Sequence, residues 1–90
     1  MIYSGVKLFN LKATHGVPLD ITLSALLDHN IRVNWVEFID TARRNKWWDF
    51  QTLEAITDAL EDTGYARSDI HHITLRVKAY MLANKIEEGQ

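Results

Sequence analysis

Residues 43–48 form a cluster of cationic and aromatic side chains whose types are well suited to binding. The cluster consists of Arg43, Arg44, Lys46, Trp47 and Trp48. Arginine and lysine neutralise phosphates, and indole rings stack on unpaired bases or anchor protein interfaces. Alternatively, these side chains stabilise the turn between two helices, and the cations complement the helix dipole at the C-terminal end of the preceding helix. Because adjacent tryptophans seldom both bury fully, we expect one in the core and the other partly exposed.

A second candidate is an apolar row on the helix that we expect to begin at Ser68. That helix has apolar residues on two nearly opposite sides. One side consists of Ile70, Ile73, Val77, Tyr80 and Met81, and the other consists of Leu75, Ala79, Leu82 and Ile86. A row of four apolar side chains left in water would be unusual. The second row is therefore either a dimer or partner surface, or it is covered by the first segment of the chain.

The remaining polar residues lack the patterns that catalysis or metal binding requires. His71 and His72 are adjacent, so on a helix they point about 100° apart and cannot share an ion. His15 and His29 are near expected helix ends, where an imidazole can bond to terminal carbonyls. The sequence has no cysteine, no glycine-rich phosphate loop and no nucleophile at motif spacing from a base. We expect no enzyme, no catalytic or metal-ligating residue and no cofactor.

Hydrophobic spacing predicts five short helices that position these candidates. The expected segments cover residues 4–14, 18–30, 34–45 and 49–64, followed by the helix from Ser68. Residues typical of helix ends are Gly16, Pro18, Asn30, Asn34 with Glu37 as a capping box, Asp49 and Gly64. Residues 73–79 also alternate as a strand would, but a lone strand has no mate, so we favour a helix.

Each of the first four segments has an expected buried face. These faces are Ile2, Val6, Phe9 and Ala13; Leu19, Leu23, Leu26 and Leu27; Trp35, Phe38, Ile39 and Ala42; and Phe50, Leu53, Thr57 and Leu60. In the first segment, Val6 and Leu8 would also fit a strand. The overall prediction is an all-α, compact bundle of about five short helices in one domain, residues 1–90.

Composition narrows the class of protein. Ninety residues suit a single core, and 47% hydrophobic residues make disorder improbable. The net charge of −2 gives no global attraction to nucleic acid or anionic membrane. Because the sequence has no export signal, no apolar run long enough to span a membrane and no cysteine, we expect a cytoplasmic protein without membrane contact.

Residues 11–38 resemble a segment of alanyl-tRNA synthetases that reads L-Y-D-T-Y-G-F-P-L-D-L-T, then a helix, a glycine, V-D and a phenylalanine. The matching residues are Leu11, Thr14, Gly16, Pro18, Leu19, Asp20, Thr22, Val33 and Phe38. The departures are His15, Val17, Asn30 and Asn34, which stand where the family has Tyr, Phe, Gly and Asp. The resemblance implies a helix, a tight turn and a second helix. The resemblance covers about a third of the chain. We do not expect aminoacylation, because the ATP-binding motifs of the family are missing, and the Cys ligands of its editing site are missing as well.

These observations favour a non-catalytic binding module that engages a partner protein. Short proteins similar to this one occur in phages and prophages, so we expect a phage-encoded accessory protein. The alternative is RNA or DNA binding through residues 43–48, related to the tRNA-recognition part of the synthetases. A homodimer formed through the second row of the last helix is a third possibility.

Overall fold

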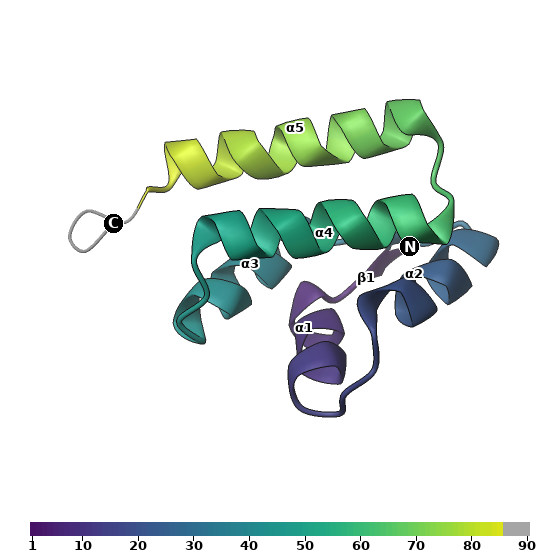
Figure 1. The fold of residues 1–90 in the computed structure, drawn as a ribbon, viewed down its shortest axis with the longest axis horizontal. Helices are drawn as coiled ribbons and strands as arrows, with labels where there is room; N and C mark the ends of the chain where they lie inside the picture. The colour runs from purple at the N-terminus through teal and green to yellow at the C-terminus, as the bar shows by residue number, and fades with distance from the viewer. Residues whose placement is uncertain (86–90) are drawn as a thin grey trace.

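The computed structural model describes residues 1–85 and shows five helices and one short pair of strands (Figure 1). The order is β1 (Ile2–Tyr3), α1 (Gly5–Ala13), α2 (Leu19–Asp28), β2 (Arg32–Val33), α3 (Trp35–Arg44), α4 (Asp49–Thr63) and α5 (Arg67–Ala83). The predicted all-α bundle of five short helices is confirmed. Residues 73–79 lie in the middle of α5, so the strand alternative for them is wrong.

Side chains at the starts of α1 and α3 cap free backbone N–H groups. The Ser4 hydroxyl accepts a hydrogen bond from the Lys7 N–H at 3.2 Å. The Asn34 side chain accepts one from the Glu37 N–H at 3.2 Å. These short polar side chains satisfy donors that have no partner inside the helix, so the helices begin where the sequence indicates.

Three helices end in the same Schellman-type geometry, in which a left-handed residue reverses the chain. The left-handed residues are Asn30, Lys46 and Gly64, with φ of 56°, 70° and 91°. The next residue then donates its N–H to a carbonyl five positions earlier, as Ile31 does to Leu26, Trp47 to Ala42 and Tyr65 to Leu60. Asn30 and Gly64 were expected here and Lys46 was not. Each reversal turns an apolar or aromatic side chain back onto the core.

The two strands were not predicted. Ile2 and Tyr3 pair in parallel with Arg32 and Val33, respectively. The prediction that Ile2 belongs to the buried face of the first helix is wrong, because Ile2 lies in β1 and is exposed. A strand of two residues is too short to produce an alternating pattern, which explains why neither strand was predicted.

The helix α1 buries a different face from the expected one. Gly5, Leu8 and Phe9 are buried, whereas Val6 and Ala13 are exposed. A Cβ atom on Gly5 would lie 2.2 Å from the Asn34 carbonyl oxygen, so only glycine allows this contact between α1 and α3. The close approach of the two backbones sets the rotation of α1, and spacing alone cannot predict it.

Glu37 joins α1 to α3 instead of completing a capping box. Its Oε1 accepts a hydrogen bond from the Gly5 N–H at 2.9 Å. The Asn34 N–H, which a capping box would pair with Glu37, donates to the Tyr3 carbonyl at 3.0 Å. The predicted capping box is therefore only half correct, because the second bond goes to another helix.

The helix α4 is also rotated from the expected face. Its buried residues are Thr52, Ile56, Ala59 and Leu60. Phe50 was expected in the core but is 67% exposed. Asp49 is the first residue of α4 and not its cap, and its carboxylate is paired with Arg43. Because α4 packs against α2, α5 and α3, its buried face follows its neighbours.

The helix α5 forms an outer layer on α4 and α3 (Figure 1). Val77 and Met81 are buried, and Ile70, Ile73 and Tyr80 are packed against the core as expected. Leu75, Ala79 and Leu82 are exposed, so the first segment of the chain does not cover them. Ile86, the fourth member of that row, lies outside the described residues.

Candidate functional site

Arg43 has a structural position at the junction of three helices. Its Nε and Nη2 donate to the two carboxylate oxygens of Asp49 at 3.0 and 2.8 Å. Its Nη1 and Nη2 also donate to the carbonyls of Asn84 and Met81, at 2.6 and 3.2 Å. The hydrogen bonds that Arg43 donates to the Asp49 carboxylate raise the Arg43 pKa. Arg43 therefore ties the end of α3 to the start of α4 and the end of α5.

The two adjacent tryptophans divide as expected between the core and the surface. Trp47 is half-buried and meets the Phe9 ring edge-on, with 5.2 Å between ring centroids. The Lys12 ammonium lies 6.0 Å from the centroid of the Trp47 ring. Trp48 is 51% exposed. Of the predicted cluster, Arg44, Lys46 and Trp48 are thus the exposed members.

The fold brings the two predicted clusters to the same end of the molecule. The end of α3, the start of α4 and the end of α5 meet around Arg43, and Figure 1 shows α4 beginning where α5 ends. Trp48 and Phe50 are therefore exposed at the end of the molecule where Leu82 is also exposed. Local spacing could not indicate this, because Arg43 and Asn84 are far apart in sequence.

The exposed row on α5 has a cationic side chain beside it. We define the α5 surface as Leu75, Lys78, Ala79 and Leu82, all of which are exposed. Leu75 and Leu82 are 55% and 73% exposed. Their spacing of seven residues puts them on one side of the helix, with Lys78 and Ala79 between them. The α5 surface thus combines apolar side chains with one positive charge.

Charge is separated between α4 and α5, although the net charge of the chain is only −2. Within α4 there are five acidic residues and no basic one. Within α5 there are three basic residues, one acidic residue and the two adjacent histidines. The helix α5 therefore carries a local excess of positive charge, which the whole-chain charge does not reveal.

The histidines do not form a metal site within the described residues. His71 and His72 are both exposed, with 6.0 Å between their ring centroids. His15 and His29 are exposed near the ends of α1 and α2. Across residues 1–85, no group of three or more His, Cys, Asp or Glu side chains is arranged to hold a metal ion.

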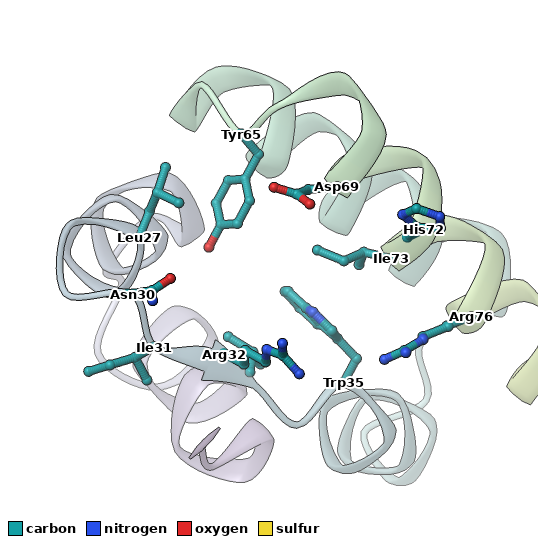
Figure 2. Close-up of a pocket in the computed structure, with 11 residues that line it drawn as sticks. Leu27, Asn30, Ile31, Arg32, Trp35, Tyr65, Asp69, His72, Ile73 and Arg76 are labelled. Atoms are coloured by element: carbon teal, nitrogen blue, oxygen red, sulfur yellow. The ribbon is translucent and has the colours of Figure 1, made fainter. Parts of the chain in front are cut away.

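A pocket of about 470 Å³ lies on the side of α5 that faces α2 and α3 (Figure 2). Its floor consists of the half-buried side chains Leu27, Ile31, Val33, Trp35, Tyr65 and Ile73. Its rim consists of the exposed side chains Asn30, Arg32, Asp69, His72 and Arg76. This pocket was not predicted from the sequence. One signal was available, since Ile31 and Tyr65 each directly follow a left-handed helix end.

Two tyrosines have pKa values raised by their surroundings. Burial is the main cause of the raised Tyr65 pKa, and the charge of Asp69 adds to it. For Tyr80 the main cause is the hydrogen bond that its hydroxyl donates to the Asp40 carboxylate at 2.7 Å. Both hydroxyls therefore keep their protons at neutral pH. Tyr65 is the one that faces the pocket.

Among the described residues, no helix is both long enough and apolar enough to cross a membrane. The segment 11–38 forms the end of α1, a turn with Gly16 in left-handed backbone, α2, β2 and the start of α3. The helix, turn and helix that the resemblance implies are present, while the relation to alanyl-tRNA synthetases stays a prediction. No family model, curated protein or solved structure matches this chain.

Proposed function

We propose that this protein is a non-catalytic binding module that docks an acidic, amphipathic segment of a partner protein on its α5 surface. The observation that carries the proposal is the exposed row Leu75, Ala79 and Leu82 on a helix whose opposite side is buried in the core. The resemblance of residues 11–38 supports a phage-encoded accessory protein as the context.

The apolar part of the α5 surface suits a helical partner. A single exposed leucine is ordinary on a protein surface. Leu75 and Leu82 are two turns apart on one side of α5, and the small Ala79 between them leaves space for a side chain from a second helix. An amphipathic helix that inserts leucines around Ala79 would cover the row and remove it from water.

The charges beside the row favour an acidic partner. Lys78 lies within the α5 surface, and Arg76 lies on the same helix toward the pocket. Neither side chain forms an ion pair within residues 1–85. Glutamate or aspartate on the partner would pair with them, whereas a second copy of α5 would bring like charges together. The charge pattern therefore favours a heterologous partner over a symmetric dimer.

The aromatic side chains at the end of α5 extend the contact. Trp48 and Phe50 are largely exposed, and they lie at the end of the molecule where Leu82 is. Large aromatic side chains contribute strongly to interfaces because they bury a large area with few rotatable bonds. A partner that reaches past Leu82 would contact them next.

The test uses a synthetic amphipathic peptide with leucines on one side and glutamates beside them. We expect it to shift the amide NMR signals of α5, while a peptide with lysines in place of the glutamates does not. Leu82→Glu should weaken binding by about tenfold or more, because it puts a charge in the apolar centre. Ile21→Glu on α2 is the matched control, since Ile21 is 60% exposed and outside the α5 surface. Equal losses in both variants would contradict the proposal.

Two other outcomes would replace this function with a different one. Retardation of tRNA or single-stranded DNA, weakening steeply as salt rises, would indicate a nucleic-acid-binding module centred on Arg44, Lys46 and Trp48. A mass near twice 10.4 kDa in light scattering that Leu82→Glu returns to the monomer value would indicate a homodimer.

A further inference from the structure

The pocket beside α5 combines an aromatic floor with a charged rim. Trp35 and Tyr65 contribute two half-buried rings to the floor, and aliphatic side chains fill the space around them. Its volume of about 470 Å³ is within the range that small organic ligands occupy. An apolar ring placed in this pocket would remove both aromatic surfaces from water.

The charges on the rim are unbalanced. Arg32 and Arg76 are the cationic residues of the rim, and Asp69 is the acidic residue among the lining side chains. Within residues 1–85, neither arginine forms an ion pair, and the side chain of neither is hydrogen-bonded to another residue of the chain. In Figure 2 the side chains of Arg32 and Arg76 reach toward the Trp35 indole from opposite sides. Two guanidinium groups beside the same pocket, neither of them paired with a carboxylate, favour binding of an anion near them.

Phosphate fits this rim better than a carboxylate does. A phosphate monoester carries up to two negative charges near neutral pH and presents three acceptor oxygens. Each guanidinium can bind two of those oxygens in its planar fork, and His72 can donate a further bond. A single carboxylate has one negative charge and two oxygens, so it matches two arginines and an imidazole less well than a phosphate does.

Asp69 lies across the pocket from the two arginines, close to Tyr65 (Figure 2). Its carboxylate would repel the phosphate but accept hydrogen bonds from sugar hydroxyl groups. The Tyr65 hydroxyl keeps its proton and can donate a bond beside it. The pocket therefore presents an anion-binding side, an aromatic floor and a side that accepts hydroxyl groups.

We propose that this pocket binds a nucleoside monophosphate, with the base stacked on Trp35, the phosphate between Arg32 and Arg76, and the sugar hydroxyls toward Asp69. This site goes beyond the proposed function, since its ligand is a small molecule and its floor is separate from the row Leu75, Ala79 and Leu82. The two proposals share Arg76, but Trp35 and Arg32 belong to the pocket alone, so the Trp35 signal and Arg32→Gln distinguish a failure of one from a failure of the other.

The test follows the indole N–H signals of the three tryptophans by NMR during titration with adenosine monophosphate. We expect the Trp35 signal to shift while the exposed Trp48 signal stays in place. Adenosine and inorganic phosphate should each bind at least about tenfold more weakly than adenosine monophosphate, because each lacks half of the contacts. Absence of a Trp35 shift at millimolar nucleotide, or an equal response to inorganic phosphate, would overturn the proposal.

Variants on the rim separate a built site from general attraction to positive charge. Arg76→Gln and Arg32→Gln should each weaken nucleotide binding by about tenfold, since each removes a charge-assisted pair. Arg67→Gln makes the same change on α5 outside the pocket and should leave binding unchanged. All three side chains are exposed, so unchanged thermal unfolding is expected for each. Equal weakening in Arg67→Gln would overturn the proposal.

Discussion

The contact between α1 and α3 and the attachment of α5 stabilise the same small core by different means. At the first, two backbones touch at Gly5, Glu37 bonds to the Gly5 N–H, and the Phe9 and Phe38 rings meet with 5.5 Å between centroids. At the second, α5 buries one stripe and is held at its end by the hydrogen bonds of Arg43.

The difference shows where this chain can carry function. A backbone contact tolerates no added atom, so α1 and α3 cannot move closer to one another or rotate at this point without a clash. The helix α5 uses side chains for its contacts and keeps its outer side exposed. The α5 surface and the pocket both use this less tightly packed helix, as binding elements often do.

Gly5→Ala tests the first contact and should have the largest effect. The new methyl group would lie 2.2 Å from the Asn34 carbonyl oxygen, so we expect the free energy of unfolding to fall by about 3 kcal/mol. Urea unfolding measures this loss. Gly16→Ala is the control, because its φ of +69° adds backbone strain of about 1 kcal/mol without a steric clash. Equal losses would show that α1 and α3 are not in close contact.

Substitutions at the adjacent residues Met81 and Leu82 compare the buried and the exposed side of α5. Met81 is 7% exposed, and Met81→Ala should lower the free energy of unfolding by roughly 2 to 3 kcal/mol through the cavity it leaves. Leu82 is 73% exposed, so Leu82→Ala should change it by less than about 0.5 kcal/mol. Thermal and urea unfolding check both values. A large loss in Leu82→Ala would mean that the α5 surface is covered within the protein itself.

Arg43→Met tests the polar attachment of α5. It removes the ion pair with Asp49 and the bonds to Met81 and Asn84, so we expect a loss of about 2 kcal/mol. Hydrogen exchange should speed up at the end of α5 and stay slow in α1. Arg44→Met, at an exposed neighbour, should have little effect. Uniform acceleration over the whole chain would contradict a local role for Arg43.

Tyr80 gives the attachment of α5 a dependence on pH. The hydrogen bond to Asp40 raises the Tyr80 pKa in the folded state, so the folded protein holds this proton more tightly than the unfolded chain. The stabilisation is complete below the ordinary tyrosine pKa of about 10 and is lost as pH rises through the folded pKa. Tyr80→Phe should cost at most about 1 kcal/mol at pH near 8, with a smaller difference above pH near 10.

Asp40→Asn is the matched control for this pH dependence. It removes the negative charge that accepts the Tyr80 hydrogen bond. Urea unfolding of wild type, Tyr80→Phe and Asp40→Asn across alkaline pH separates this contact from general alkaline unfolding. A difference between wild type and Tyr80→Phe that grows above the ordinary tyrosine pKa would contradict the assignment.

Some of the candidate site was predictable and some was not. The cluster at residues 43–48 and the exposed row on α5 were identified from residue types and spacing. The partners of Arg43 could not be predicted, because Met81 and Asn84 are distant in sequence. The pocket could not be predicted either, since its rim collects residues from the end of α2, from β2 and from α5.

The sequence by itself determined where α1 and α3 begin and where α2 and α4 end. These helix ends depend on hydrogen bonds that reach only a few residues along the chain, so the local residue types predict them. The residues are Ser4, Asn34, Asn30 and Gly64. The tertiary structure decided which faces are buried, as Gly5 shows for α1. Burial depends on how closely distant elements approach, and one glycine without a Cβ can change that approach.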